Sequence, residues 1–139
     1  MSEGYRTFEH TGDLGLEVWA TTPERLHALA ALALAAQEVE AAGDPIAVEV
    51  SLALEGEDPA DLLVHWLNTS LLEAQVRRAV WTEAEIEVLG PRSLRGRLRG
   101  ALRDRARHVF LREIKAASHH GLTLELEPGR CRCRLILDL

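Results

Sequence analysis

Aromatic side chains, cysteines and long apolar runs are all scarce in this chain of 139 residues. Aromatics make up 4% of it and only two residues are cysteines, whereas small secreted domains depend on several disulfides. The longest segment rich in alanine and leucine, residues 26–36, is too short for a transmembrane helix, which needs about 20 apolar residues. A signal-peptide pattern is also missing from the first residues. We therefore expect one cytoplasmic domain, over residues 1–139, that crosses no membrane.

The two cysteines, Cys131 and Cys133, are separated by one residue in a segment with strand-like alternation. Their side chains should share one face of that strand, where a disulfide between them would be strained. A zinc site made by both thiolates and a histidine of an adjacent strand is an alternative, but a single C-x-C pair is a weak signal for it. His119 and His120 are neighbours that point to opposite faces of a strand, so they do not favour a shared metal site.

Lysine is scarcer still, since Lys115 is the only one in the chain. The formal net charge is -6, but the charge is unevenly distributed. Residues 1–64 carry 13 acidic and 2 basic side chains, whereas residues 65–139 carry 9 acidic and 14 basic ones. A chain that is acidic in total can therefore still present a basic surface to an acidic or phosphate-bearing partner.

Two helices are predicted from their start signals and apolar spacing. Residues 22–24 (Thr-Pro-Glu) supply an N-cap, a proline and a first-turn acid, which predicts a helix over 23–41 that ends at Gly43. Its alanines and leucines surround the whole cylinder, so we expect burial on more than one side. Residues 58–61 repeat the start pattern and predict a second helix over 59–78 with one core face.

The rest of the chain alternates between apolar and polar residues and predicts strands. The expected strands are 5–9, 16–20, 46–56, 84–88, 93–103, 109–118, 122–127 and 131–138. Turns are expected at the HTGD, LGPR, RAR, HHG and PGR segments. These elements predict an α+β fold in which two helices pack with a mostly antiparallel sheet, or fill the gap between two sheets.

The segment HTGDLGL at residues 10–16 is typical of a turn, because glycine tolerates positive φ and aspartate bonds nearby backbone. At the other end of the chain, Asp138 directly precedes the terminal carboxylate of Leu139. If the last strand lies beside the first hairpin, Asp13, Asp138 and this carboxylate form an all-oxygen site for a hard cation such as Ca²⁺ or Mg²⁺. A turn aspartate and an exposed terminal charge are the simpler alternative.

Arginine is concentrated in residues 92–107, where Arg95, Arg97 and Arg99 would share one strand face. Charge that protects a sheet edge from aggregation is the commoner use of such a pattern. A docking surface for nucleic acid or an acidic protein is the alternative. Aromatic residues that stack on single-stranded bases are not interleaved here, which disfavours direct RNA binding.

A general acid–base set is conceivable from Glu113, Lys115 and His108, although a Glu–Lys pair on a solvated face explains the first two equally well. The sequence contains no nucleophile elbow, phosphate loop or metalloprotease helix. We therefore expect a protein that is not an enzyme. His27 and His65 fall on the predicted helices and are expected at the surface or its boundary.

Four segments, taken in order, resemble the archease family, small acidic proteins that act as cofactors of the tRNA-splicing RNA ligase. They are EHTGDLGLEVWATTPERLHALAALAL, DLLVHWLNTSLLEA, RHVFLREIKAASHHGLTLE and the final RLILDL. The resemblance covers nearly the whole chain. Its most specific parts are the opening His-Thr-x-Asp-x-Gly, the Glu-Ile-Lys-Ala block ending in histidine, and the final Leu-Asp-aliphatic.

The resemblance implies an auxiliary factor of a GTP-dependent RNA ligase, which joins a 2′,3′-cyclic phosphate or 3′-phosphate RNA end to a 5′-hydroxyl. Archeases promote guanylylation of the ligase and its repeated turnover, and they meet RNA only through the ligase. The family also carries a divalent metal, usually described as calcium. By motif, Asp13, Asp138 and Leu139 would hold that metal. The resemblance suggests His10, Lys115 and His119 as residues around the metal or in contact with the ligase.

Three residues depart from the family pattern. His65 replaces an acid, Cys131 an aromatic and Gly12 an alanine. None of these changes affects a residue that is expected to bind the metal. The ligase could serve tRNA splicing or RNA repair with the same chemistry. Two alternatives are a chaperone-like modulator of another tRNA-processing enzyme, such as a tRNA methyltransferase, and a phosphohydrolase, for which no clear nucleophile or general base is present.

Overall fold

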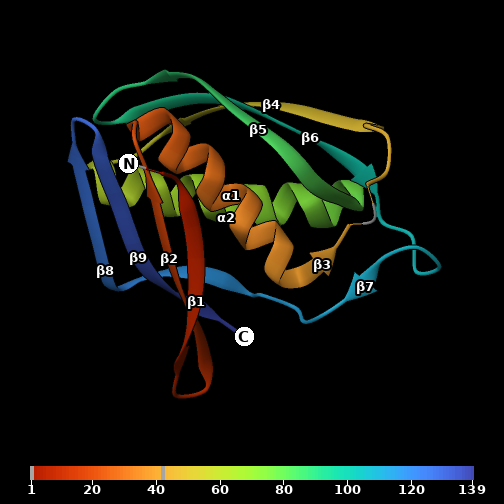
Figure 1. The fold of residues 1–139 in the computed structure, drawn as a ribbon. Coiled ribbons are helices and arrows are strands. Elements are labelled where there is room, and N and C mark those ends of the chain that lie inside the picture. Colours follow the sequence, from red (N-terminus) through yellow and green to blue (C-terminus); the bar gives the residue numbers. More distant parts are fainter. Residues whose placement is uncertain (1, 42) are drawn as a thin grey trace.

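The computed structural model describes residues 2–41 and 43–139 of the chain. In chain order the elements are β1 (Gly4–His10), β2 (Asp13–Ala20), α1 (Pro23–Glu38), β3 (Val39–Glu40), β4 (Val48–Glu55), α2 (Pro59–Arg77), β5 (Ala79–Leu89), β6 (Ser93–Leu102), β7 (Val109–Phe110), β8 (Ala116–Glu127) and β9 (Arg130–Asp138). The two helices and the antiparallel strands confirm the predicted α+β class (Figure 1). Within these residues, neither helix is long and apolar enough to cross a bilayer.

The strands form three antiparallel sheets. The largest has the order β1-β2-β9-β8, the second has the order β4-β6-β5, and the short strands β3 and β7 pair with each other. In the four-stranded sheet, β9 lies between β2 and β8, although β8 directly precedes it and β2 is near the start of the chain. The first hairpin and the last strand are therefore neighbours, as the predicted cation site requires.

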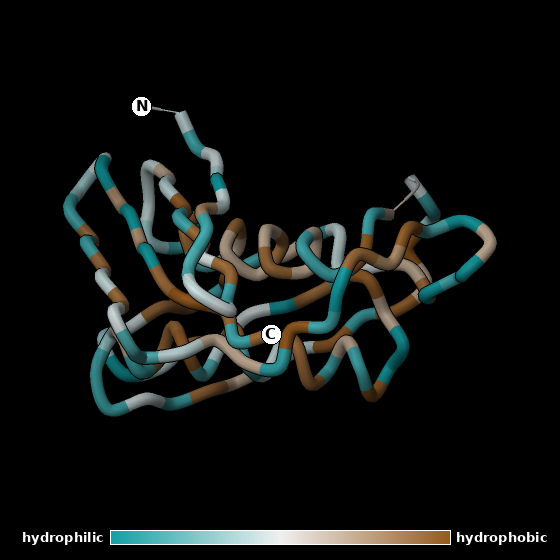
Figure 2. The backbone as a smooth tube through the Cα atoms, turned by 90° about the horizontal axis from the view of Figure 1, so that it is seen from below, coloured by the Kyte–Doolittle hydropathy of each residue, from teal (hydrophilic) through white to brown (hydrophobic). Residues whose placement is uncertain are grey.

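Both helices lie between the two larger sheets. The first helix, α1, contacts β5 on one side and β1, β2 and β9 on the other, while α2 contacts β8 together with β4, β5 and β6. Burial therefore extends around α1, where the fully or nearly buried residues are Leu26, Ala28, Ala30, Ala31, Ala33 and Leu34. Hydrophilic stretches of the chain gather in the loops at the two ends of the molecule (Figure 2). Of the two predicted arrangements, the one with helices between two sheets is observed.

The helices begin where the sequence predicts, because their caps are formed. The Thr22 hydroxyl accepts a bond from the Arg25 amide at 3.1 Å, and the Asp58 carboxylate accepts one from the Asp61 amide at 2.8 Å. Arg78, in the left-handed conformation, ends α2 close to the predicted residue.

The end of α1 differs from the prediction of residue 41. The helix stops at Glu38, and Gly43 lies in the loop beyond it. Val39 and Glu40 adopt an extended conformation and pair with Phe110 and Val109 of β7. This pairing with a distant strand, which local propensity does not reveal, shortens the helix.

The prediction of a strand over 109–118 and a turn at HHG is wrong, whereas residues 122–127 form a strand as predicted. Residues 111–115 have no regular structure, and β8 continues through the predicted turn. Its pairing with β9 shifts register between Ser118 and Thr123, so the extra residues bulge out of an unbroken strand. Gly121, at φ +70°, belongs to this irregularity and not to a chain reversal.

Two buried tryptophans donate hydrogen bonds to main-chain carbonyls of the helices. The indole of Trp66 donates to the carbonyl of His27 at 2.8 Å, and that of Trp81 donates to the carbonyl of Ser70 at 2.9 Å. His27 itself is buried, with its Nδ1 at 2.8 Å from the Pro23 carbonyl, and burial lowers its pKa. The expectation that His27 lies at the surface is therefore wrong, because sheets cover α1 on both sides.

Candidate functional site

One end of the four-stranded sheet gathers most of the predicted site residues. His10 and Asp13 face each other across the β1–β2 hairpin, whose two-residue turn contains Gly12 at φ +74°. Pairing of β2 with β9 reaches Leu14 and Leu137, so Asp13 and Asp138 are the next positions on these neighbouring strands. We call this end of the sheet, with His10, Asp13, Asp138 and Ala116, the aspartate rung.

The fourth strand completes the aspartate rung. Ala116 of β8 is the Cα partner of Asp138. One residue earlier, the Lys115 amide donates to the Asp138 carbonyl at 2.8 Å. This bond carries the pairing past the start of β8 and anchors Lys115 beside the rung, while the side chain of Lys115 stays exposed.

Strand alternation directs the two aspartates away from the helices. Leu16 and Leu137 are fully buried on the core face, so Asp13 and Asp138, at odd spacing from them, lie on the opposite face. Both aspartates are half-buried. His10 Nδ1 lies 3.9 Å from a carboxylate oxygen of Asp13, which is an ion pair when the imidazole is protonated.

The donor chemistry of the rung suits a hard cation. Directly opposed side chains on antiparallel strands lie about 5 Å apart, and Leu139, which directly follows Asp138, is exposed. Within residues 2–41 and 43–139, no group of three or more His, Cys, Asp or Glu side chains is arranged to hold a metal ion. A cation at the rung would therefore need a main-chain carboxylate at Leu139 in addition to the two aspartates.

His119 is separated from the aspartate rung. It lies three residues beyond Ala116 on β8, and its Nε2 is 3.1 Å from a carboxylate oxygen of Asp61 in the first turn of α2. The Asp61 pKa is lowered, first by the Glu57 amide that bonds its carboxylate at 2.8 Å and then by His119. Of the three suggested contact residues, the fold brings His10 and Lys115 to the rung and places His119 at the start of α2.

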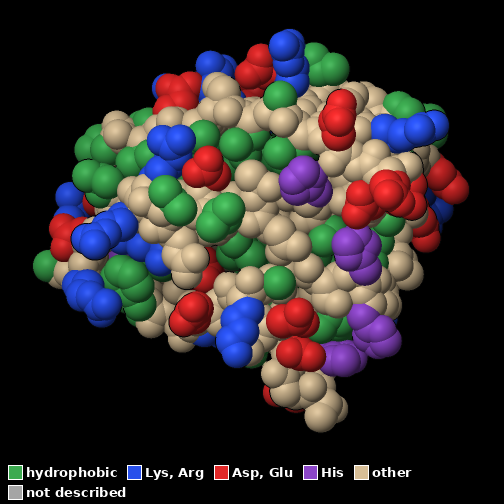
Figure 3. All heavy atoms as spheres, turned by 180° about the vertical axis from the view of Figure 1, so that it is seen from behind, with side chains coloured by type: hydrophobic (Ala, Val, Ile, Leu, Met, Phe, Trp, Pro, Cys, Tyr) green, Lys and Arg blue, Asp and Glu red, His purple; other side chains and the backbone are tan. Residues whose placement is uncertain are grey.

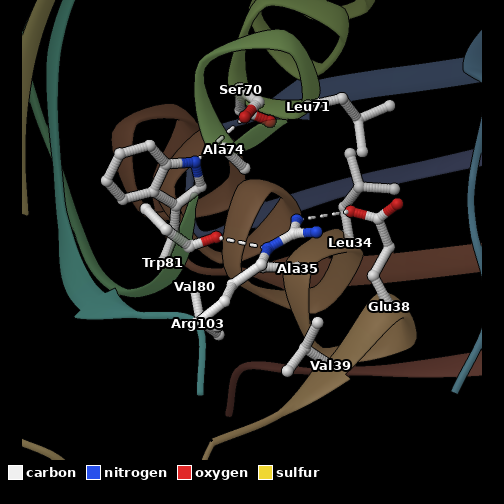
Figure 4. A pocket seen from close by; sticks show the side chains of 11 residues that line it. Leu34, Ala35, Glu38, Val39, Ser70, Leu71, Ala74, Val80, Trp81 and Arg103 are labelled. Atoms are coloured by element: carbon white, nitrogen blue, oxygen red, sulfur yellow. Dashed lines mark hydrogen bonds and ion pairs between the residues drawn. The ribbon is translucent and has the colours of Figure 1, made fainter. Parts of the chain in front are cut away.

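Glu38 is a site-supporting residue that sequence reasoning missed. Its carboxylate is buried at the end of α1, accepts a bond from the Ile114 amide at 3.0 Å and lies 3.5 Å from the guanidinium of Arg103 (Figure 4). The Glu38 carbonyl accepts a second bond from the Leu111 amide at 2.8 Å. These contacts hold the irregular segment 111–115, which leads directly into the rung.

Burial raises the pKa of Glu38, and the Ile114 amide and Arg103 only partly oppose it. Arg103 is fixed in turn, because its Nε donates to the carbonyl of Ala79 at 3.0 Å (Figure 4). The carboxylate is thus a buried connection between α1, the end of β6 and the segment before Lys115.

Asn68 of α2 is a second missed residue. Its side-chain oxygen accepts from the Ala117 amide at 2.7 Å and its side-chain nitrogen donates to the Ala117 carbonyl at 3.2 Å. One amide side chain therefore satisfies both backbone groups of an edge-strand residue next to the rung. This pair of bonds fixes the position of β8 against α2.

The two cysteines share a face as predicted, and that face is the core. Cys131 and Cys133 are free and fully buried, and burial raises the pKa of Cys133 to about 12. Within the described residues, they join no group of metal-binding side chains. The alternative of a zinc site is therefore not supported.

The arginines of β6 do not form the sheet edge predicted as their commoner use. The strand β6 is the centre of its sheet. Arg97 is within 3.3 Å of Glu49 on β4 and 2.8 Å of Glu85 on β5, and Arg99 approaches Glu49 and Glu83. These side chains form a cross-strand ion-pair network within the molecule.

His108, considered for acid–base chemistry with Glu113 and Lys115, is buried in the loop before β7. Its Nε2 contacts the Asp44 carboxylate and its Nδ1 accepts a bond from the Asp104 amide at 3.0 Å. Arg107 also contacts Asp44, at 2.6 Å. The imidazole thus joins two loops, 103–108 and the loop containing Asp44.

Comparison with known proteins places this geometry in a family. The model of the Archease protein family (MTH1598/TM1083) matches residues 5–139. The protein archease of Methanopyrus kandleri is 32% identical over 138 residues, covering 97% of this chain and 99% of its own, and that of Pyrococcus furiosus is 29% identical over 136 residues, covering 95% and 96%.

Solved structures show the same fold. The solution structure of protein 1598 of Methanobacterium thermoautotrophicum superposes with a TM-score of 0.83 at 24% identity, covering 98% of this chain and 99% of its own. The crystal structure of an archease from Thermotoga maritima, described as a possible chaperone, has a TM-score of 0.66 at 21% identity and covers 96% of both chains. The nearly complete match to the family and the identity to the Methanopyrus protein show that this chain belongs to the archease family.

Proposed function

We propose that this protein is a non-catalytic cofactor of a GTP-dependent RNA ligase and promotes guanylylation and repeated turnover of that ligase. Its working site is the aspartate rung, with a divalent cation, calcium in preference to others. The observation that supports this is the pairing of β2 with β9, which makes Asp13 and Asp138 direct neighbours on the outer face of the sheet. Membership of the archease family supports the choice of partner.

The cation would be held by the side chains of Asp13 and Asp138 and by the main-chain carboxylate of Leu139. Calcium takes six to eight oxygen ligands, so these groups leave positions for water or for oxygens of the partner. When bound, the cation supplies positive charge that phosphate oxygens of a nucleotide can share. The half-buried position of both aspartates keeps them close to solvent and to a docked enzyme.

His10 and Lys115 have the positions needed to contact the partner around the cation. Both side chains are exposed, and the main chain of Lys115 is fixed by its bond to Asp138. Lys115 would approach phosphate or carboxylate groups as a point charge. His119, held by Asp61 at the start of α2, would contact the ligase from a neighbouring region and not through the cation.

The test is a guanylylation assay with the ligase of the same organism, GTP, divalent metal and substoichiometric amounts of this protein. Wild type should accelerate guanylylation over many turnovers. Asp13→Asn and Asp138→Asn should lower the stimulation at least about tenfold, as loss of groups that hold a metal commonly does. Glu127→Gln, an exposed acid at the far end of β8, is the matched control and should behave as wild type.

Unchanged stimulation by both aspartate variants would refute the role of the rung, and no stimulation by wild type would refute the ligase assignment. Hydrolysis of a generic phosphoester by the protein alone would instead favour a phosphohydrolase. The first two results differ in which protein fails to change ligase guanylylation as expected, and the third is measured without the ligase. One series of experiments can therefore distinguish all three.

A second candidate function is chaperone-like support of another tRNA-processing enzyme, such as a tRNA methyltransferase. The exposed apolar side chains at one end of the molecule favour it, and the Thermotoga maritima structure is described as a possible chaperone. In this case the protein should raise the soluble, active fraction of the methyltransferase, and Asp13→Asn should leave that effect intact.

A further inference from the structure

Six of the exposed large apolar side chains lie at the end of the molecule opposite the start of α2. They come from the last turns of α2, from the end of β6 and from the chain between β6 and the aspartate rung: Leu72, Val76, Leu102, Val109, Phe110 and Leu111. A monomer rarely gathers so many exposed apolar side chains without a binding role. We call these residues, together with the arginines described below, the apolar–basic surface.

Two hollows join Leu72, Phe110 and Leu111 of the apolar–basic surface. A hollow of about 420 Å³ is lined by Gln75 of α2 and by Arg103, Arg105, Phe110 and Leu111. A second hollow of about 310 Å³ is lined by Leu72, Gln75 and Lys115 among others. Gln75, Glu38 and Glu113 belong to both, so the two hollows adjoin and form a groove from the β7 region to the segment next to the rung. Its cationic lining residues, three arginines and Lys115, outnumber these two carboxylates, one of which is paired with Arg103.

Arginines border this groove. The Arg103 amide donates to the Arg78 carbonyl at 2.8 Å, which joins the end of β6 to the end of α2. Arg105 lies over the ring of Phe110 at 5.2 Å, and Arg112 donates to the carbonyl of Gln37 at 2.6 Å. Figure 3 shows apolar and basic side chains side by side toward the left of this face, whereas histidine and acidic side chains gather toward the right.

The charge of Arg103 is met by Glu38, whereas the other three arginines form no ion pair among the described residues. Among the described residues, no carboxylate oxygen lies within 4.0 Å of the side-chain nitrogens of Arg78, Arg105 or Arg112, whereas Arg97 and Arg99 of β6 each approach two glutamates. The same residue type is thus paired where it faces its own sheet, whereas Arg105 and Arg112 are left for an external acid where they line the groove.

We propose that the apolar–basic surface docks an acidic amphipathic segment of a partner protein. Apolar side chains of the segment would cover Leu72, Phe110 and Leu111 in the groove, and its carboxylates would meet the unpaired arginines. The surface is a poor platform for single-stranded RNA, because its apolar members are mostly aliphatic and Arg105 lies over the one aromatic ring. A twofold dimer through the same surface would bring arginines against arginines.

The probe is a fluorescein-labelled helical peptide of about five turns, with leucine at i, i+3, i+4 and i+7 and glutamate elsewhere. Fluorescence anisotropy measures its binding to the full chain in buffer with EDTA. The assay contains neither ligase nor divalent metal, so its outcome is independent of the proposed function. Wild type should bind it, and a peptide with lysine in place of glutamate should bind at least about tenfold more weakly.

Two variants and a control locate the binding. Leu72→Glu and Arg105→Glu each introduce repulsion at the groove and should weaken binding at least about tenfold. Val88→Glu is the matched control, since Val88 of β5 is 51% exposed and lies outside the surface. It should bind as wild type does, and thermal unfolding should show all three folded.

The inference is overturned if wild type does not bind the glutamate peptide or if both groove variants bind as tightly as wild type. It is also overturned if a single-stranded RNA oligonucleotide binds more tightly than the peptide and loses binding in the same variants. Sedimentation that shows a wild-type dimer dissociated by Leu72→Glu would identify the surface as a contact between copies instead.

Discussion

The carboxylate of Glu38 is one of few acidic groups in an interior built mainly from leucine and alanine. A buried carboxylate is stable only when hydrogen bonds replace its water, and here the Ile114 amide and Arg103 do so. The same bonds fix the irregular segment before Lys115, so a residue far from the rung in sequence controls where the rung ends. Removing the side chain would leave the Ile114 amide without its acceptor.

Glu38→Gln should change how stability depends on pH. Burial raises the Glu38 pKa above its unfolded value of about 4.5, so its contribution to stability is fully present below that value and is lost as pH rises through the folded pKa. Glutamine keeps an acceptor oxygen but does not ionise. Relative to the variant, wild type should therefore lose unfolding free energy as pH rises above about 4.5, measured by urea denaturation at several pH values.

Glu38→Ala provides the control for the hydrogen bonds themselves. Relative to Glu38→Gln, it should lose about 1–3 kcal/mol of unfolding free energy at every pH, because the buried amide and Arg103 lose their acceptor. A difference between wild type and Glu38→Gln that does not vary with pH would contradict the assignment of a raised pKa to this group.

At the scale of elements, β8 is an edge strand that needs support. It pairs with β9 on one side only, and its ladder is interrupted between Ser118 and Thr123. Asn68 compensates by bonding both backbone groups of Ala117 from the side of α2. The helix thereby sets the position of the strand that carries the outer part of the rung.

Asn68→Ala should loosen β8 without unfolding the molecule. Loss of the two bonds should lower the unfolding free energy by about 1–3 kcal/mol and speed amide hydrogen exchange at Ala117 more than at Leu135 of β9. Gln75→Ala, which removes an exposed amide from the same helix, is the comparison variant. Equal acceleration at both amides would show a global loss of stability and not a local loosening of β8.

Local sequence signals predict the elements whose boundaries depend on local chemistry. The caps at Thr22 and Asp58 place both helix starts correctly, and strict alternation identifies β6 and β9. Strand order is not local, so the sequence does not show that β6 is central and its arginines internally paired. Gly121 signals a turn in the sequence, but pairing with β9 on both sides of it keeps the segment within one strand.

The candidate site also combines features that local sequence predicts with features that depend on the fold. Asp13 and Asp138 flank apolar-alternating strands, so their position at strand ends is predictable, and only their proximity needs the fold. Glu38 and Asn68 bond backbone groups that are 76 and 49 residues away in sequence. No residue type or spacing indicates such partners, because any backbone amide has the same chemistry.

For the whole molecule, the acidic first half and the basic second half do not form separate bodies. Strand β4 of the first half pairs with β6 of the second, and β2 pairs with β9, so glutamates and arginines meet across the sheets. Part of the charge asymmetry is thus neutralised internally. What remains is an outer rung with two aspartates at the end of one sheet and an apolar–basic surface beyond the end of the other.

Calcium should stabilise the whole molecule, because the proposed site joins the first hairpin to the last strand. A ligand that binds only the folded state adds about 2.7 kcal/mol at a concentration of 100 Kd. Thermal unfolding in calcium should therefore occur at a higher temperature than in EDTA, and Asp138→Asn should abolish the difference while Glu127→Gln keeps it. An equal shift in Asp138→Asn would place the ion elsewhere.

The position of β9 between β2 and β8 also determines when the molecule can be completed during its synthesis. A nascent chain that has emerged only as far as β8 holds two strands with unpaired facing edges, and such edges attract other chains. The strand that fills this gap is the last to leave the ribosome of all those described. Asp138 arrives with it, so an immature chain has no aspartate rung to offer a partner.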